Sequence, residues 1–471
     1  MNDEAPLVNT NRLPVWFAGI ALLFGSAMVF LTPPFQVTDE FWHFFRAYQV
    51  SQGGFVAKSQ GNAQGAVLPF SLLRLANRFA KLPQHPAEKT SFKAILDARQ
   101  IPLDPGQETF TNFPFSANYS PLVYAPQAIA MAVGRWAGLK PLAFFYLGRE
   151  ATLLAWTAAG FFTLRLVPGL RAAILILMLM PMSLSLAASM SADAVTIALC
   201  LLFTALVWHC GAGKDASFEI GRRSKAAIFG LSIGVSLCKF AYWPLISLVL
   251  LIPPVRFGGT RRYVRFIVVM VVTNIVVSVA WMSQTAGTKL VLRPERTDVN
   301  ASGQMAFVRS HPIAFCEAVG RGLEHDGPFI VASFVGNLGW IDTPLPPVVV
   351  GVYLLALLAA CVPMRGDPTV PAGWQLGVIA AAVCACVVIF AFLNYLVWTP
   401  VGGLRLEGLQ GRYFIPLGAA GLILIWGAMR RYFKAIPPRP DAWQINLIAI
   451  GLCICGCFYT LLLLLRRYFE A

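Results

Sequence analysis

Residues 13–49 read LPVWFAGIALLFGSAMVFLTPPFQVTDEFWHFFRAYQ, an uncharged apolar run followed at once by a concentration of ionisable side chains. Residues 13–31 are long enough to cross the hydrocarbon core of a bilayer, and they end without a small-residue cleavage site, which favours an uncleaved anchor over a signal peptide. A helix that begins near Thr38 brings Asp39, Glu40 and His43 onto one face, because positions three and four apart are neighbours. The stretch therefore predicts either a capped helix at the membrane interface or an active site.

The composition of the chain predicts a membrane protein. Of 471 residues, 57% are hydrophobic and only 13% are charged, which is typical of several bilayer-spanning helices. The net charge of +15 could suggest nucleic acid as a partner, but much of it lies in three short loops, at residues 222–225, 256–265 and 430–439. Positive short loops mark the cytoplasmic side of a membrane, so this charge indicates orientation and not nucleic-acid binding.

We predict an all-α polytopic membrane protein of about 11 transmembrane helices that forms a single integral membrane domain over residues 1–471. The three basic loops orient these helices in the membrane. The expected spans are residues 13–31, 144–164, 170–187, 194–210, 226–240, 241–255, 266–283, 348–362, 374–397, 413–429 and 443–465. Residues 32–142 then form a long outer (periplasmic) loop with juxtamembrane helices, and residues 284–345 form a second outer segment. Residues 121–139 look long enough to cross, but a crossing there would place all three basic loops outside. We therefore predict a non-spanning outer helix, although Arg466 and Arg467 then lie outside as well.

With this topology, ionisable side chains from five separate parts of the chain reach the outer membrane surface. The candidates for catalysis are Asp39, Glu40 and Asp193, and those for substrate binding are His43, Arg149, Lys239, Tyr242, Arg405, Arg412 and Tyr413. Charges at membrane depth are costly and usually face a cavity or a partner. Each has a structural alternative: Arg149 could pair with Glu150, Lys239 could extend to the interface, and Asp193 could cap a helix. For Asp39 and Glu40 we favour a function, because capping needs only one carboxylate.

Several stretches of the chain resemble a known superfamily. They are PPFQVTDEFWHFFRAYQ (33–49), NYSPLVYAP (118–126), SMSADAV (189–195), GNLGWIDTPLP (336–346) and LQGRYFIP (409–416). An acidic pair after the first span and another acid in the next outer turn resemble the GT-C superfamily of membrane glycosyltransferases. The residues of these stretches are more closely similar to a bacterial polytopic membrane family of unknown function that is usually grouped with GT-C enzymes. No P-loop, dinucleotide fingerprint, nucleophile elbow or zinc spacing is present in the sequence.

The resemblance implies an inverting glycosyltransferase that uses a polyprenyl-phosphate sugar as donor. It implies a multi-pass protein of the bacterial inner membrane, acting on the outer face in cell-envelope glycan assembly or modification, with membrane lipid around it and an unknown glycan or lipid acceptor. Asp39 would be the general base on the acceptor hydroxyl, Asp193 the second acid, and Arg412 the residue that holds the carrier phosphate. The chain has Asp-Glu where some members have Asp-Asp, which leaves open whether Asp39 or Glu40 is the base.

The residues themselves suit this chemistry either without or with a metal ion. Displacing a polyprenyl phosphate from an anomeric carbon needs a base on one side of the sugar and positive charge at the phosphate on the other, and a single displacement inverts the anomeric centre. Arg149, Lys239 and Arg412 could supply that charge without a metal. Alternatively, a divalent cation could serve as cofactor, with ligands among Asp39, Glu40, His43 and Asp193.

Two other classes of protein would use the same charges. A secondary transporter for an anionic or lipidic substrate would bind it there, although transporters tend to have repeated halves and midplane sites, and the sequence shows no repeat. A non-catalytic subunit that binds carrier lipid would need the cations but not Asp39.

Overall fold

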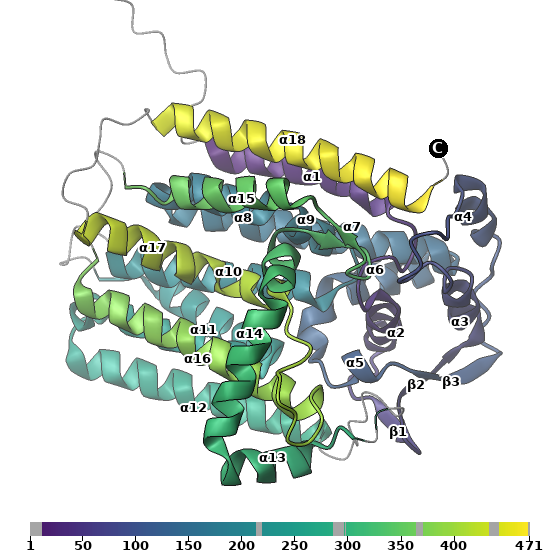
Figure 1. Ribbon diagram of the computed structural model, residues 1–471, viewed down its shortest axis with the longest axis horizontal. Helices are drawn as coiled ribbons and strands as arrows, with labels where there is room; N and C mark the ends of the chain where they lie inside the picture. The colour runs from purple at the N-terminus through teal and green to yellow at the C-terminus, as the bar shows by residue number, and fades with distance from the viewer. Residues whose placement is uncertain are drawn as a thin grey trace, which may run out of the picture.

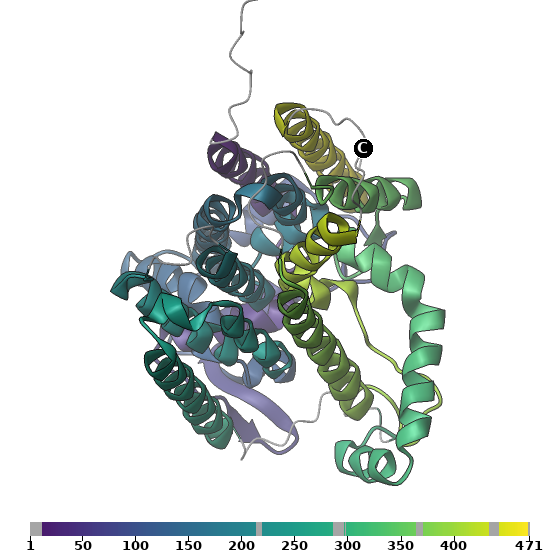
Figure 2. The same ribbon diagram turned by 90° about the vertical axis from the view of Figure 1, so that its left-hand side faces the viewer.

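Long helices lie side by side in a bundle, and the segment that follows the first of them covers one end (Figures 1 and 2). The structure is a computed structural model and describes residues 12–212, 219–285, 296, 298–363, 371–432 and 442–469. We call the end of the bundle that carries residues 40–117, at the right of Figure 1, the sheet end.

The α-helices are α1 (Leu13–Leu31), α2 (Glu40–Ser51), α3 (Phe70–Asn77), α4 (Phe92–Ala98), α5 (Pro114–Ala117), α6 (Ala125–Trp136), α7 (Pro141–Leu166), α8 (Arg171–Leu179), α9 (Pro181–Ala187), α10 (Ala192–Ala212), α11 (Arg222–Cys238), α12 (Thr260–Thr285), α13 (Ala301–Ser310), α14 (Pro312–Val335), α15 (Pro347–Ala360), α16 (Gly373–Val397), α17 (Gly418–Tyr432) and α18 (Ala442–Tyr468). The 3-10 helices are η2 (Pro121–Tyr124), η3 (Pro168–Leu170), η4 (Phe240–Leu251), η5 (Pro254–Phe257) and η6 (Gly411–Leu417). The strands are β1 (Lys58–Gln60), β2 (Ala63–Pro69), β3 (Glu108–Asn112), β4 (Asn337–Leu338) and β5 (Thr343–Pro344). β1, β2 and β3 form one antiparallel sheet in that order, and β4 pairs with β5.

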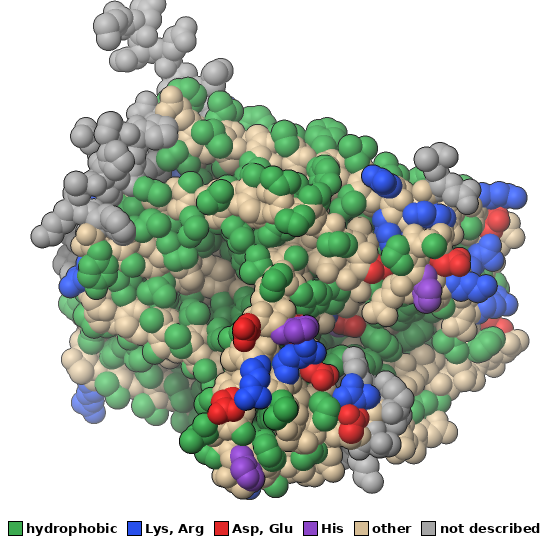
Figure 3. Space-filling view, in the orientation of Figure 1, with side chains coloured by type: hydrophobic (Ala, Val, Ile, Leu, Met, Phe, Trp, Pro, Cys, Tyr) green, Lys and Arg blue, Asp and Glu red, His purple; other side chains and the backbone are tan. Residues whose placement is uncertain are grey.

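Six of the described helices are long and apolar enough to cross a membrane, or seven spans if a bent pair counts as one. They are α1, α10, α12, α16, α18 and the continuous η6–α17, and the bent pair is α7 with η3–α8, at an angle of 110°. In Figure 3, apolar side chains are spread widely over the face, as expected for a surface in contact with lipid, while most charged side chains gather at the lower centre and the right. The structure thus shows a mostly helical chain with several candidate spans.

The other expected spans correspond to shorter helices. α11 has 17 residues, η4 has 12 and α15 has 14. Expected span 170–187 is divided at Met180 into α8 and α9, because Pro181 has no backbone N–H to donate to the turn before it. Pro244 lies inside η4, which is wound as a 3-10 helix over its whole length.

Residues 121–139 contain η2 and α6. The 12 residues of α6 are about 18 Å long, well short of the roughly 30 Å of a bilayer core. α6 packs against α2 and α7 at the sheet end.

The described residues of the basic loops at 222–225 and 256–265 lie at the end of the bundle opposite the sheet. α10 begins beside the residues that precede η4, and α12 ends where Trp281 Nε1 donates to the carbonyl of Asn118, 3.0 Å away, in the segment between α5 and η2. The other ends of these helices, which adjoin residues 219–225 and 256–265, therefore lie far from β1–β3, as the left side of Figure 1 shows. The sequence-based topology has these loops together on the cytoplasmic side.

Candidate functional site

Four charged side chains from four separate parts of the chain meet at a cavity of about 210 Å³ at the sheet end of the bundle. They are Asp39 before α2, Asp193 at the start of α10, Lys239 between α11 and η4, and Arg412 in η6. The described residues that line this cavity are Asp39, His43, Pro114, Phe115, Asn118, Tyr119, Asp193, Lys239, Trp398, Gln410, Arg412 and Tyr413. We call it the charged cavity.

The four groups alternate in sign. Arg412 Nη2 donates to Asp39 Oδ2 at 2.7 Å, and Lys239 Nζ donates to Asp193 Oδ1 at 2.6 Å. Arg412 Nη1 lies 3.6 Å from Asp193 Oδ2, close enough for attraction but too far for a hydrogen bond. This buried nitrogen has no hydrogen-bond partner among the described residues. The two negative and two positive charges sum to zero, and this pairing compensates the cost of burying them. Arg412 Nη1 still has N–H groups without an acceptor in the described part of the chain.

Asp39 is the most exposed member of this set. Its side chain is 27% exposed, against 10% for Asp193, 16% for Lys239 and 4% for Arg412. A group that enters the cavity can therefore reach the Asp39 carboxylate while the other three charges stay shielded from water.

The backbone at Asp39 explains why its side chain faces the cavity. Asp39 has a left-handed conformation (φ 66°) and occupies the N-cap position of α2, but its carboxylate accepts no N–H from that helix. Its backbone carbonyl accepts from the N–H groups of Trp42 and His43 instead, both at 3.1 Å. Holding a non-glycine residue in this region costs about 1–3 kcal/mol and often marks a functional site. A helix-capping role for the Asp39 side chain is therefore excluded by the geometry.

Glu40 lies elsewhere, and this corrects the expectation that Asp39, Glu40 and His43 share one helix face. α2 begins at Glu40, two residues after Thr38, so Asp39 is outside the helix, and its side chain meets Arg412 while that of Glu40 meets Arg149. Glu40 and Arg149 have no exposed side-chain area and do not line the charged cavity. The two form a pair in which Arg149 Nε and Nη2 donate to Glu40 Oε1 and Oε2 at 2.8 and 2.7 Å.

Arg149 uses all five of its N–H groups inside the protein. Besides Glu40, it donates to the carbonyls of Val29 and Thr32, each at 2.7 Å, and of Pro33 at 3.1 Å. These carbonyls end α1, where the last turn of a helix has no internal donors. Arg149 therefore joins the end of α1 to the start of α2. The alternative partner considered from the sequence, Glu150, instead accepts from Ser26 Oγ at 3.2 Å.

His43 is buried at the wall of the charged cavity. Its Nδ1 lies 2.7 Å from the Tyr124 hydroxyl, in hydrogen-bond contact. Burial lowers the pKa of His43 from its ordinary 6.5 to about 4, although Asp39 and Asp193 act in the opposite direction. The imidazole is therefore neutral near pH 7 and adds no charge to the four already present.

This burial predicts a pH dependence of stability. Between about pH 6.5 and about pH 4 the unfolded chain takes up a proton at His43 that the folded protein does not, so stability falls as the pH drops through this window. His43→Gln should reduce the loss, since glutamine does not titrate. The check is the thermal unfolding midpoint of both proteins between pH 4 and pH 7. Parallel curves would contradict a neutral, buried His43.

Of the predicted tyrosines, Tyr413 lines the charged cavity and Tyr242 supports it from outside. Lys239 Nζ lies 5.1 Å from the ring centre of Tyr413 and 5.4 Å from that of Tyr119, in cation–π range. The Tyr242 hydroxyl donates to the carbonyl of Tyr413 at 3.0 Å and so fixes the segment after Arg412. Arg405 does not appear among the described residues that line the cavity.

Sequence reasoning missed the neutral wall of the cavity. Phe115, Asn118, Tyr119, Trp398 and Gln410 all line it, yet none was singled out. Asn118 and Tyr119 lie within NYSPLVYAP and Gln410 within LQGRYFIP, so the resembling stretches carried a signal for these three. Phe115 and Trp398 carried none, because aromatic side chains near a membrane are common.

The proposed metal ligands are already engaged with other partners. Asp39 pairs with Arg412, Asp193 with Lys239, and Glu40 with Arg149. Within the part of the chain that the structure describes, no group of three or more His, Cys, Asp or Glu side chains is placed to hold a metal ion. These side chains therefore do not fit a divalent cation in this arrangement.

Comparison with known proteins gives one match. The family described as "Predicted membrane protein (DUF2142)" matches residues 22–420, a range that includes every member of the charged cavity. No curated protein and no solved structure matches the chain.

Proposed function

The chain belongs to this family of predicted membrane proteins, and from that premise we propose that it is an inverting glycosyltransferase of the GT-C type. Its donor would be a polyprenyl-phosphate sugar on the outer face of the bacterial inner membrane. The observation that carries the proposal is the charged cavity itself, in which an accessible carboxylate, Asp39, lies together with two shielded cations, Lys239 and Arg412.

The cations suit the phosphate of the donor. Arg412 Nη1 has an unused donor, and Lys239 has three N–H groups of which Asp193 accepts one at 2.6 Å. Asp193 keeps both cations in place, so little reorganisation is needed when charge develops on the leaving phosphate. A preorganised donor of this kind contributes about 3 kcal/mol to transition-state stabilisation.

Asp39, the most accessible of the four charges, then acts on the acceptor. The acceptor oxygen attacks the anomeric carbon and passes its proton to the Asp39 carboxylate. The bond from that carbon to the phosphate oxygen breaks, and its electron pair stays on the carrier phosphate. One displacement inverts the anomeric centre.

A second cavity gives the lipid part of the donor a place beside the phosphate site. It has a volume of about 490 Å³, and its walls come largely from α11, α12 and α16. The residues it shares with the charged cavity are Asn118, Tyr119, Lys239, Trp398 and Tyr413. The rest of its lining is mainly apolar, including Trp281, Met282 and Phe390. An isoprenoid chain in this space would have its phosphate next to Lys239.

The proposal includes the full topology of about eleven crossings. The 17 residues of α11 rise about 25 Å, and the 12 residues of η4, as a 3-10 helix, rise about 24 Å. With their flanking residues, both approach the thickness of a bilayer core. The proposal places the sheet end outside and Arg222, Arg262 and Arg431 in the cytoplasm.

Cysteine labelling tests this topology. In intact cells, an impermeant maleimide should label Gln60→Cys in the exposed strand β1 and leave Arg262→Cys unlabelled until the membrane is opened. The parent chain, with its own cysteines, sets the background. Labelling of Arg262→Cys in intact cells would reverse the orientation and remove the outer-face reaction.

Replacing Arg412 tests the phosphate site. Arg412→Ala should weaken donor binding and turnover together, each by about a hundredfold, because the guanidinium contacts the phosphate before and during the reaction. The measurement is donor retention and donor consumption by the purified variant. Arg321→Ala is the matched control, since Arg321 is exposed and pairs with Glu317 on α14. Unchanged donor retention in Arg412→Ala would contradict the proposed role.

A further inference from the structure

A larger cavity opens on the other side of Asp39. It has a volume of about 760 Å³ and shares Asp39, Pro114, Phe115, Trp398 and Gln410 with the charged cavity. The proposed donor does not need this space, because its phosphate and lipid lie on the Lys239 side. We call it the aromatic cavity.

Its walls combine aromatic faces with polar groups, among them carboxylates and amides. The aromatic side chains are Trp42, Phe115, Phe329, Trp340 and Trp398. The polar ones are Thr38, Asp39, Gln84, Asn112, Asp326, Glu407 and Gln410. Three of these are carboxylates, and no Lys, Arg or His is among the described residues that line the cavity.

Each of these carboxylates has a basic side chain nearby that is not among the described residues lining the cavity. Arg412 contacts Asp39 from the charged cavity, His325 Nδ1 lies 2.7 Å from Asp326, and Arg296 lies 3.8 Å from Glu407. Among the described residues, the surface presented to a ligand therefore consists of carboxylates, neutral polar groups and aromatic rings, without a cationic side chain.

Backbone strain is concentrated around this space. Among the described residues, the non-glycine residues with positive φ are Phe35, Asp39, Gln84 and Ile341. Asp39, Gln84 and Ile341 line the aromatic cavity, and the carbonyl of Phe35 accepts from Trp340 Nε1 at 2.9 Å. Left-handed phenylalanine and isoleucine are uncommon, and such conformations persist only where surrounding contacts over-determine them.

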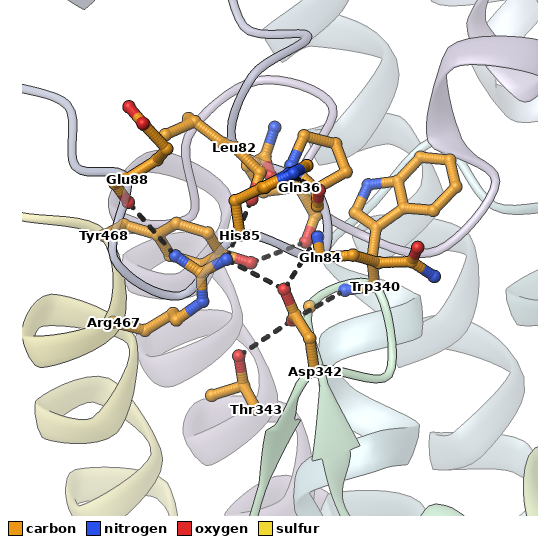
Figure 4. Close-up of polar contacts among 12 residues, drawn as sticks. Gln36, Leu82, Gln84, His85, Glu88, Trp340, Asp342, Thr343, Arg467 and Tyr468 are labelled. Atoms are coloured by element: carbon orange, nitrogen blue, oxygen red, sulfur yellow. Dashed lines mark hydrogen bonds and ion pairs between the residues drawn. The ribbon is translucent and has the colours of Figure 1, made fainter.

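Those contacts are visible in Figure 4, where the end of α18 holds one wall. Arg467 Nη2 donates to Asp342 Oδ2 at 2.8 Å, and the same oxygen accepts the backbone N–H of Gln84 at 3.0 Å. Asp342 Oδ1 accepts the N–H of Trp340 at 3.1 Å. Asp342 thus holds the backbones of Gln84 and Trp340, which line the cavity, and Arg467 supports this wall from outside the lining through its buried pair with Asp342.

We propose that the aromatic cavity binds the acceptor, and that the acceptor group there is a sugar ring with hydroxyl or amino substituents and no phosphate. Flat aromatic faces suit the C–H faces of a sugar, while carboxylate and amide oxygens accept from its hydroxyl or ammonium groups. A phosphate in this cavity would lie near three carboxylates of the same sign of charge, and this repulsion disfavours a phosphorylated acceptor. The inference rests on the proposed function, because Asp39 must reach a hydroxyl from this side.

The test is saturation-transfer NMR on the full-length protein in detergent, without donor. The probes are methyl glucoside, methyl glucosaminide and glucose 6-phosphate. We expect the first two to bind the wild type at least about tenfold more tightly than the phosphate, a difference of about 1.4 kcal/mol. Equal binding of the phosphate, or no binding of either uncharged or amino probe, would overturn the proposal.

Two variants and one control locate the binding. Trp340→Ala should weaken binding of both favoured probes by about tenfold. Gln84→Gly removes a lining side chain, keeps the backbone N–H to Asp342 and relieves the positive φ, so it should fold normally and still lose affinity. Trp136→Ala is the control, because Trp136 is 90% exposed on α6. Wild-type affinity in Gln84→Gly and Trp340→Ala would overturn the assignment.

This experiment separates the subsite from the reaction. Donor consumption without binding of these probes would refute the acceptor subsite alone. Probe binding at this cavity with no consumption of any donor would refute the glycosyltransferase and leave a sugar-binding membrane protein.

Discussion

Asp39→Asn should lower turnover at least about a hundredfold while leaving the fold and donor binding close to wild type. Asparagine tolerates the left-handed backbone of this position, and its amide oxygen can still accept from Arg412 Nη2. What it loses is the capacity to take a proton from the acceptor. The substitution therefore separates general-base catalysis from the structural roles of the residue.

The measurement is sugar transfer or donor consumption by the purified variant, alongside donor retention. Asp97→Asn provides the control, since Asp97 is a half-exposed acid on α4 whose nearest ionic contact is Arg78 at 3.9 Å. Full activity in Asp39→Asn would show that the strained backbone and the ion pair serve structure only. It would also mean that a group other than Asp39 takes the proton of the acceptor.

Breaking the Glu40–Arg149 pair should cost about 3–5 kcal/mol of stability, because either single substitution leaves a buried charge without its partner. Glu40→Gln keeps the size of the side chain, and Arg149→Met keeps much of its length. Both should unfold at lower temperature than the wild type in the same detergent. The loss arises from the junction of α1, α2 and α7 and not from the charged cavity.

The double variant Glu40→Gln/Arg149→Met supplies the control. It removes both charges, so it should recover part of the stability lost by the single variants. A fully stable Glu40→Gln would contradict the structural assignment and return Glu40 to the candidates for the base.

The convergence of Asp39, Asp193, Lys239 and Arg412 could be anticipated from the sequence because topology alone brings helix ends together at one surface. Once basic loops orient the spans, residues at the opposite helix ends share one depth. The structure adds the pairing, which depends on side-chain geometry: Arg412 bridges two acids, and Lys239 contacts one.

The different roles of Asp39 and Glu40 could not be predicted, because they depend on one backbone angle and one distant partner. A helix starting near Thr38 would place both acids on the face of His43. The positive φ at Asp39 turns its side chain toward Arg412. Glu40 instead contacts Arg149, which lies 109 positions later in the chain. Adjacent acids look equivalent in sequence, and only the fold distinguishes them.

The lengths of the apolar helices were harder to predict than their existence. Apolar composition predicts η4 and α15 as membrane segments, but it does not predict the 3-10 winding around Pro244 or the residue at which a helix ends. The break at Pro181 was visible as a proline, yet proline inside an apolar run can kink a span as well as end it.

The most direct test of the central claim is to incubate the purified protein with a panel of polyprenyl-phosphate sugars and to follow each donor by mass spectrometry. The account predicts that at least one donor is consumed, with release of free polyprenyl phosphate, and that the same donor persists with Asp39→Asn. Binding of these lipids without consumption of any of them, by protein that retains its fold, would contradict it.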